Sequence, residues 1–201
     1  MILRSSGPSP FGRKVKIAAK MLGIYDQLTV EMSNTNDPAD TLRQQNPLGK
    51  IPILILDDGR KIFDSRVICE YLDAQVDGTT LHPTESDARW EALTLQALGD
   101  GIVDASILQV YETRMRPDEK RHDDWLSYQA DKVKRSLDYL SANTPSLEGD
   151  LTIGHVAIAC ALGYLDLRFE GKWRESYPTL VAWLETFDAR VPAFEATKFV
   201  A

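Results

Sequence analysis

The first 76 residues alternate between strand-like and helix-like stretches. Strands are predicted at four places where apolar residues alternate or run together: 1–4, 28–32, 51–56 and 61–63, the last two joined by an Asp-Gly turn. Helices are predicted where apolar residues recur every three or four positions: 11–22, loosely 38–45, and 67–72. The resulting order, β-α-β-α-β-β-α, is typical of a small mixed sheet with helices on both faces.

Everything after Pro83 has the spacing of helices. A long helix is predicted from Thr84 almost to Pro117, and shorter ones around 126–140, 156–163 and 180–187. The apolar stripe expected to be buried in the long helix comprises Trp90, Leu93, Ala97, Gly101, Ala105, Leu108 and Tyr111. The pattern therefore predicts an α/β domain over 1–76, a linker over 77–83 and an all-helical bundle over 84–201.

Charge and composition narrow the class of protein. The chain has 201 residues with a net charge of −7, so a broad binding surface for nucleic acid or an anionic membrane is not expected. It lacks an apolar run of the roughly 20 residues that a membrane span needs, and its N-terminal apolar stretch is too short for a signal peptide, so a cytoplasmic protein is expected. Cys69 and Cys160 lie in apolar segments and are expected to be buried thiols, with no metal site.

Ser9 is the first candidate for chemistry, because it precedes a helix directly after a strand. A serine hydroxyl there lies beside unpaired N–H groups and the positive end of the helix dipole, a place suited to an anion such as a thiolate. The same environment lowers the pKa of a thiol. The alternative interpretation is that Ser9 only caps its helix.

The segment 46–52, Asn-Pro-Leu-Gly-Lys-Ile-Pro, is the second candidate. Pro52 stands at the start of an apolar strand, where it cannot donate to the sheet. If the bond between Ile51 and Pro52 is cis, the backbone of Ile51 can pair with an extended peptide, and Lys50 can meet a terminal carboxylate. The alternative is a solvated lysine beside a loop proline.

Asp64 and Ser65 are the third candidate, at a helix start after the hairpin. Asp64 can accept hydrogen bonds from an α-amino group, while Ser65 and the helix N–H groups can hold the adjacent carboxylate. The alternative is a simple cap. Together the three segments offer a thiolate pocket, a backbone edge for a peptide, a cation and a receptor for an amino-acid end, which are the parts needed to bind glutathione.

Over essentially its whole length the chain resembles the cytosolic glutathione transferases, which combine a thioredoxin-like first domain with an all-helical second one. The resemblance is carried by Ser-Pro-Phe-Gly-Arg-Lys-Val at 9–15, Asn-Pro-Leu-Gly-Lys-Ile-Pro at 46–52, and Asp-Ser at 64–65. It implies that Ser9 contacts the sulfur, as in the bacterial serine-type members, with Ser5, Ser6 and Phe11 as further possible sulfur contacts. It also implies a cis Pro52.

The resemblance assigns the other glutathione contacts as well. Lys50 would bind the glycyl carboxylate, Ile51 the cysteinyl backbone, and Asp64 and Ser65 the γ-glutamyl group. It further implies a homodimer to which the long helix contributes. A hydrophobic electrophile would bind between the domains, near the loop 7–11 and Ser106, Val110 and Tyr111.

Three departures from the family pattern bear on chemistry and stability. Gly12 stands where a second redox cysteine would be, so disulfide exchange is disfavoured. Asp64 replaces a more usual Glu and shortens the reach toward the γ-glutamyl group. His155 replaces the acidic residue of a helix capping box that starts at Thr152, with an expected cost in helix-start stability. His82 and His122 are expected at the surface or in loops.

The expected reaction is attack of glutathione thiolate on an electrophilic carbon, as in detoxification, with the Ser9 hydroxyl donating to the sulfur and no tightly bound cofactor. Two alternatives stay open. One is a glutathione- or protein-binding regulator with this fold and no turnover, and the other is a glutathione-dependent isomerase or dehalogenase.

Overall fold

Four short strands form the sheet in the computed structural model, which describes residues 1–78 and 80–200. They are β1 (Ile2–Ser5), β2 (Thr29–Met32), β3 (Ile53–Ile55) and β4 (Lys61–Phe63), in the spatial order β2-β1-β3-β4. β1 is parallel to β2, and the other pairs are antiparallel. Ile53 lies opposite both Arg4 and Phe63, so the end of β1, the start of β3 and the end of β4 share one edge of the sheet.

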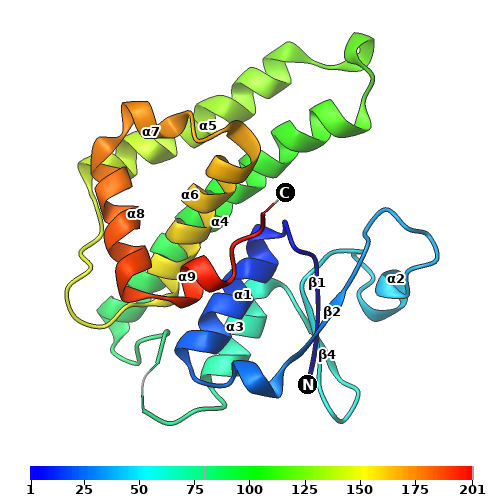
Figure 1. The fold of residues 1–201 in the computed structure, drawn as a ribbon, viewed down its shortest axis with the longest axis vertical. Coiled ribbons are helices and arrows are strands. Elements are labelled where there is room, and N and C mark those ends of the chain that lie inside the picture. The colour runs from blue at the N-terminus through cyan, green and yellow to red at the C-terminus, as the bar shows by residue number, and fades with distance from the viewer. Residues whose placement is uncertain (79, 201) are drawn as a thin grey trace. The chain divides into compact units, whose positions relative to one another are not determined.

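The helices of this part cover both faces of the sheet, as the sequence predicts. α1 (Pro10–Met21) packs against α3 (Ser65–Asp73) on one side, and the short α2 (Leu42–Gln45) lies on the other (Figure 1). A 3₁₀ turn, η1 (Tyr25–Gln27), precedes β2. The predicted element order and the thioredoxin-like class of this part are confirmed.

The rest of the chain is helical. Its elements are α4 (Ser86–Met115), the 3₁₀ turn η2 (Asp118–Lys120), α5 (Asp123–Ala142), α6 (Ile153–Phe169), α7 (Trp173–Ser176), α8 (Pro178–Arg190) and α9 (Ala193–Ala196). The four predicted helices correspond to α4, α5, α6 and α8. The single-turn α7 and α9 were not predicted, because four residues are too few to show a helical period.

Internal contacts divide the chain into two compact units, Met1–Trp90 with Val191–Ala201, and Glu91–Arg190. By this division the C-terminal residues, which the sequence pattern places in the helical bundle, group with the sheet. Arg13 of α1 ties them there: its guanidinium donates to the Phe194 carbonyl at 2.6 Å and to the Thr197 hydroxyl at 3.3 Å, and lies 4.0 Å from the centre of the Phe194 ring. The domain limits expected from sequence stay predictions, and Thr79 of the expected linker lies outside the described residues.

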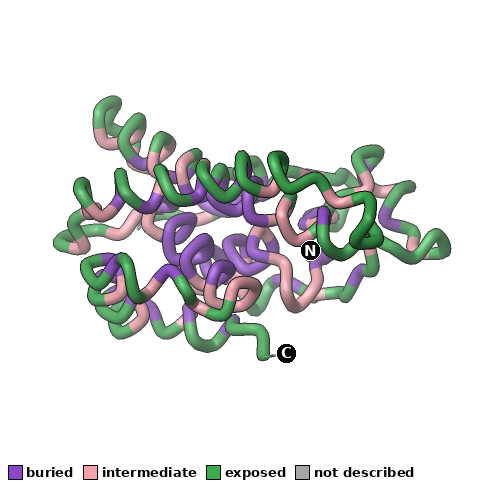
Figure 2. The backbone as a smooth tube through the Cα atoms, turned by 90° about the horizontal axis from the view of Figure 1, so that it is seen from above, coloured by how far each residue is buried: buried purple, intermediate pink, exposed green. Residues whose placement is uncertain are grey.

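The stripe predicted to be buried along α4 is wrong except at Ala105, since Leu93 is only half-buried and the other five residues are exposed. Trp90, Leu108 and Tyr111 are exposed by 63%, 40% and 42%. The physical reason is a close approach of α4 to α6: a Cβ at Gly99 would lie 2.7 Å from the Ala157 backbone of α6, and one at Gly154 would lie 2.7 Å from the Ala92 carbonyl. The residues of α4 that face α6 are therefore small. Figure 2 shows buried and exposed positions alternating along the helices of the chain.

His82 lies in a loop, as expected, but it is buried there and does not face solvent. Its ring Nδ1 lies 2.8 Å from a carboxylate oxygen of Asp73, and both side chains are about 5% exposed. Asp73 also accepts from the Thr80 hydroxyl at 2.6 Å and from the backbone N–H groups of Leu81 and His82 at 3.0 and 2.8 Å. Burial raises the pKa of Asp73, but these hydrogen bonds outweigh it and hold the pKa below its ordinary value. Asp73 at the end of α3 thus holds residues 80–82 in place through these hydrogen bonds.

His155 takes the place of the acidic residue in the cap of its helix, and the cost in helix-start stability expected from sequence stays a prediction. Its Nδ1 accepts from the Thr152 N–H at 3.0 Å, where a carboxylate usually accepts, and completes the capping box of α6. Its Nε2 lies 2.9 Å from the Ser146 carbonyl, so the neutral ring protonated on Nε2 satisfies both contacts. The ring stacks on Trp183 with a centroid separation of 6.4 Å.

We expect this cap to make the protein sensitive to acid. Burial lowers the pKa of His155 in the folded chain, whereas in the unfolded chain it titrates near 6.5. The stabilisation is therefore complete above about pH 6.5 and is lost as the pH falls through the folded-state value. His155→Ala should lower the free energy of unfolding by about 1–2 kcal/mol at pH 7.5.

Thermal unfolding at pH 7.5 and pH 5.5 checks this prediction. His155→Asp, which restores the usual carboxylate, should unfold at a temperature that changes less between the two pH values than the wild type does. Equal pH dependence in both proteins would contradict the role of the imidazole.

Two other sequence expectations concern the cysteines and membrane-spanning segments. Cys69 and Cys160 are both buried, as predicted. Within residues 1–78 and 80–200, none of the helices has the length and apolarity to cross a bilayer.

Candidate glutathione site

The three candidate segments meet at one edge of the sheet. Residues 6–9 follow β1, 46–52 precede β3, and Asp64 follows β4. The register aligns these three strand ends through Arg4, Ile53 and Phe63. Segments separated by tens of residues in sequence therefore lie together. This convergence was inferred from chemistry in the sequence and is produced by the antiparallel pairing of β3 with both neighbours.

Ser9 caps α1 and directs its hydroxyl to the start of the helix. Its Oγ accepts from the Gly12 N–H at 3.0 Å. Because this bond uses a lone pair of Oγ, the hydroxyl hydrogen stays available to donate to a bound anion. The cap and the proposed sulfur contact are thus compatible, and Pro10 at the first helical position leaves the remaining N–H groups of the first turn in place.

The buried Ser5 side chain packs directly against Gly12. Ser5 is 1% exposed, and a Cβ at Gly12 would overlap its hydroxyl. A side chain at position 12, including the second cysteine of a redox pair, would therefore require the Ser5 hydroxyl to move. Ser6 is partly exposed, and its carbonyl lies 3.5 Å from the Ser5 hydroxyl.

The C-terminal residues lie over the same loop. A Cβ at Gly7 would overlap the Phe199 ring, which is 38% exposed. Figure 1 shows the red C-terminal segment running beside the blue connection between β1 and α1. Sequence reasoning missed this contact, because nothing local in the sequence pairs positions 7 and 199.

Asn46 organises the loop that carries Lys50 and Ile51. It is 2% exposed; its side-chain amide donates to the Lys50 carbonyl at 2.9 Å and its Oδ1 accepts from the Leu48 N–H at 3.0 Å. Gly49 has φ of +61°, which a side chain would strain. Lys50 is exposed, and the backbone N–H and C=O of Ile51 bond no described residue. The quoted motif contains Asn46, but sequence reasoning gave it no role.

The peptide bond between Ile51 and Pro52 is cis. Pro52 itself is buried, directly before β3.

Asp64 sits in an unusual backbone conformation, with φ of +63° and ψ of +131°. Non-glycine residues in such conformations concentrate at functional sites. Its carboxylate accepts from the Arg66 N–H at 2.9 Å and pairs with the Arg66 guanidinium at 3.2 Å. Burial raises the pKa of Asp64, but the hydrogen bonds from Arg66 and the charges of Arg66 and Lys14 outweigh it and keep the pKa below its ordinary value. The carboxylate is charged near neutral pH, and Ser65 beside it is buried at the first position of α3.

Lys14 adds a positive charge beneath this edge. Its side chain is only 1% exposed, its ammonium lies 5.6 Å from the centre of the Phe11 ring, and its charge acts on Asp64. A cation in this position favours the ionised form of a nearby thiol. Sequence reasoning placed Lys14 in the quoted motif without a role, because its position in α1 does not by itself reveal burial.

The residues expected to line the electrophile pocket differ in their surroundings. Ser106 has no exposed area, and its hydroxyl donates to the Ile102 carbonyl of its own helix at 2.7 Å. It is therefore the least suited of the three residues to contact a substrate. Val110 is partly exposed and Tyr111 is 42% exposed.

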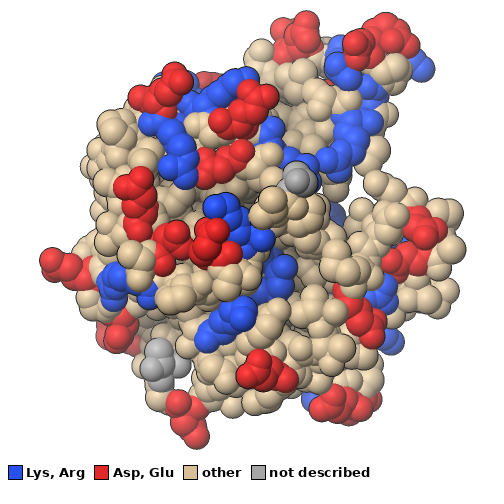
Figure 3. All heavy atoms as spheres, in the orientation of Figure 1, with Lys and Arg blue, Asp and Glu red and all other residues tan. Residues whose placement is uncertain are grey.

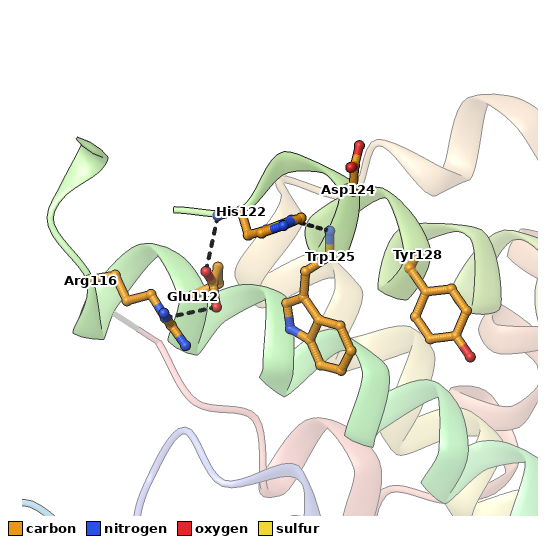
Figure 4. A pocket seen from close by; sticks show the side chains of 6 residues that line it. All are labelled: Glu112, Arg116, His122, Asp124, Trp125 and Tyr128. Carbon is orange, nitrogen blue, oxygen red and sulfur yellow. Dashed lines mark hydrogen bonds and ion pairs between the residues drawn. The ribbon is translucent and has the colours of Figure 1, made fainter. Parts of the chain in front are cut away.

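A separate cavity of about 460 Å³ lies between the end of α4 and the start of α5. Figure 4 shows the Trp125 indole beside the Tyr128 ring, and Glu112 bonded both to Arg116 at 3.1 Å and to the His122 N–H at 3.2 Å. His122 is exposed, as expected, and caps α5 by accepting from the Trp125 N–H. No candidate site residue lines this cavity.

Acidic and basic side chains are intermixed over the face drawn in Figure 3.

The chain is similar to known proteins in both its first part and its helical part. The family description "Glutathione S-transferase, N-terminal domain" matches residues 8–75, and "Glutathione S-transferase, C-terminal domain" matches residues 97–186. The "Uncharacterized GST-like protein YibF" of Escherichia coli is 34% identical over 94% of this chain and 95% of its own length.

Solved structures give the same result. A glutathione transferase family member from Pseudomonas fluorescens Pf-5 with bound glutathione is 41% identical, with a TM-score of 0.93 over 100% of this chain and 99% of its own. A second structure of that relative, 40% identical with a TM-score of 0.90 over the full length of both chains, holds S-(propanoic acid)-glutathione. The chain therefore belongs to the glutathione S-transferase family.

Proposed function

We propose that this protein is a glutathione transferase that joins the glutathione sulfur to an electrophilic carbon. The observation that carries the proposal is the convergence of Ser9, the loop 46–52 and Asp64 at one sheet edge, beside the start of α1. The glutathione held by a relative of 41% identity supports the same ligand here. The relative that holds glutathione with propanoic acid on its sulfur supports a carbon–sulfur product.

In the proposed complex each part of glutathione meets one segment. The sulfur lies at Ser9, with Ser5, Ser6 and Phe11 nearby. The Ile51 backbone pairs with the cysteinyl residue next to Pro52, Lys50 meets the glycyl carboxylate, and Asp64 with Ser65 holds the γ-glutamyl group. The electrophile would contact Val110 and Tyr111, with Ser106 as the least exposed of the three, and no tightly bound cofactor takes part.

The chemistry needs no protein base in this scheme. The Ser9 hydroxyl, the N–H groups of the first turn of α1 and the Lys14 charge stabilise the thiolate, whose proton leaves to water. The sulfur then attacks the acceptor carbon.

We also propose that the protein is a cytoplasmic homodimer with 1–76 as the glutathione-binding domain and 84–201 as the helical domain, joined by 77–83. Exposed Trp90 at the start of α4 is suited to a subunit contact.

The test is calorimetric titration of glutathione into the wild-type protein, with conjugation of 1-chloro-2,4-dinitrobenzene followed in parallel and the products identified by mass spectrometry. Binding together with a glutathione conjugate supports the proposal. Binding without turnover indicates the regulatory alternative, and regenerated or oxidised glutathione indicates an isomerase or dehalogenase. Absence of binding at millimolar glutathione sinks the proposal.

Lys50→Ala should raise the KM for glutathione by about tenfold with little change in kcat, because the lost charged hydrogen bond contributes equally before and during reaction. Lys61→Ala is the matched control. Lys61 is also exposed, but it pairs with Ile55 at the other end of β3. Similar effects of the two substitutions on KM would contradict a specific contact at Lys50.

A further inference from the structure

Arg4 is a buried arginine that has no part in the proposed reaction. It lies on β1 directly before Ser5, and both its backbone and its side chain are shielded from solvent. Burying a guanidinium is costly unless its donors find partners. The partners of Arg4 therefore indicate what this side chain does.

Among the described residues, the hydrogen-bond partners of the Arg4 guanidinium all lie between positions 33 and 45. Nε donates to the Ser33 hydroxyl at 2.8 Å, and Nη2 pairs with the Asp40 carboxylate at 2.8 Å. Nη1 donates to the Thr41 hydroxyl at 3.2 Å and to the side-chain oxygen of Gln45 at 2.8 Å. One planar group with fixed donor directions thus holds the start and the end of this segment at once.

Asp40 is the second anchor of the same segment. Its carboxylate accepts from the backbone N–H groups of Asn34 and Leu42, both at 2.8 Å, in addition to Arg4. These two hydrogen bonds and the Arg4 charge outweigh the effect of burial and hold the pKa of Asp40 below its ordinary value. The carboxylate is therefore charged near neutral pH, and its ion pair with Arg4 orders a segment whose one helix is the short α2.

Arg4 also contacts the residues at both ends of the loop 46–52. Gln45, the last residue of α2, directly precedes the loop and accepts from the Arg4 side chain. Ile53, the first residue of β3, directly follows the loop and lies opposite Arg4 in the antiparallel pair of β1 and β3. Both ends of the loop are therefore held by one residue that lies far from them in the sequence.

Inside the loop, Asn46 connects the held end to the residues proposed to bind glutathione. Its N–H donates to the Leu42 carbonyl of α2 at 2.8 Å, and its side-chain amide donates to the Lys50 carbonyl at 2.9 Å. A displacement of α2 is therefore passed on to Lys50 and Ile51 through hydrogen bonds. A shift of about an ångström at a binding residue is enough to weaken recognition strongly.

We propose that Arg4 is a positioning residue for glutathione: it holds α2 and β3 at the spacing that places Lys50 and the Ile51 backbone against the ligand. The inference rests on the proposed function, because it assumes that the loop 46–52 binds glutathione. Arg4 touches no part of the ligand in this scheme, and the carbon–sulfur step at Ser9 does not use it. Its loss should therefore weaken glutathione binding without slowing the step that follows.

Two thiols that differ by one glycine test this role. Conjugation of 1-chloro-2,4-dinitrobenzene is measured with glutathione and with γ-glutamylcysteine in the wild type, Arg4→Lys and Gln45→Ala. Arg4→Lys keeps the buried charge but loses the fixed donor directions of the guanidinium, and Gln45→Ala removes only the contact at the start of the loop.

We expect the KM for glutathione to rise about tenfold in Arg4→Lys and about threefold in Gln45→Ala, with kcat changed by less than about twofold. The KM for γ-glutamylcysteine should rise less, because this thiol has no glycyl carboxylate for Lys50 to meet. A general loss of stability would not distinguish the two thiols.

Gln44→Ala is the matched control, because Gln44 is the exposed neighbour of Gln45 in α2 and its side chain bonds no described residue. Thermal unfolding shows that each variant is folded at the assay temperature. An unchanged KM in Arg4→Lys, equal rises for the two thiols, or an effect of Gln44→Ala as large as that of Gln45→Ala would overturn the inference.

Calorimetric titration of glutathione separates this inference from the proposed function, since it needs no turnover. If Lys50→Ala weakens binding whereas Arg4→Lys and Gln45→Ala do not, the positioning role is wrong and the proposed glutathione site stands. If the wild type does not bind glutathione, or if none of the three variants binds it more weakly, the loop 46–52 is not the site and both proposals fail.

Discussion

We expect Ser9→Ala to lower kcat for glutathione conjugation by about 10²–10³-fold, the usual cost of removing one donor to a developing or bound anion. The variant loses the hydroxyl hydrogen that Ser9 can offer to sulfur while its lone pair accepts from Gly12. The pKa of the bound thiol should rise accordingly, since the thiolate loses a hydrogen bond. The pH profile of kcat/KM reports both effects.

The capping role of Ser9 has to be separated from its sulfur contact. Ser9→Ala also removes the cap of α1, at about 1 kcal/mol of stability. Ser9→Asp keeps a good cap but places a negative charge beside the thiolate, so it should unfold like the wild type and turn over no faster than Ser9→Ala. If turnover survives in Ser9→Ala, the sulfur contact moves to Ser5, Ser6 or a backbone N–H, and the corresponding alanine variants identify which.

The second large effect is expected at Asp73. Asp73→Ala removes the acceptor of four hydrogen bonds and leaves His82 buried without its partner, so it should lower the free energy of unfolding by about 3–5 kcal/mol. The free energy is measured by urea denaturation at pH 7.

Two further variants make the Asp73 prediction specific. Asp73→Asn keeps one oxygen acceptor and should lose less than Asp73→Ala. Asp77→Ala is the matched control, since Asp77 is exposed and bonds no described residue. A loss below about 1 kcal/mol in Asp73→Ala would show that these hydrogen bonds contribute no more than a surface contact.

Most of the candidate site could be predicted from sequence because its parts are local. A serine before a Pro-initiated helix, a proline at a strand start and an Asp-Ser pair at a helix start each carry their chemistry within a few residues. Asn46 and Lys14 lie inside the same quoted segments but were given no role. Their importance depends on burial, which a polar side chain in a loop or on a helix does not reveal.

His155 and His82 show how tertiary contacts change a local interpretation. In the capping box His155 departs from the family pattern, yet its ring nitrogen accepts the same N–H because Ser146 fixes the other nitrogen. His82 sits among linker residues typical of a surface, but Asp73 draws it into a buried cluster. In both cases a partner nine residues away decides the role of the histidine.

The sequence by itself determined the element order, the helical nature of everything after Pro83 and the three segments that carry the proposed chemistry. Periodicity, capping residues and turn residues act over a few positions, so they are legible along the chain. Only the tertiary structure decided which face of α4 is buried, that Val191–Ala201 return to the sheet through Arg13, and that Asp73 holds His82 in a buried cluster. These features depend on contacts between residues far apart in sequence, where the free energy comes from packing and charge pairing and leaves no local pattern.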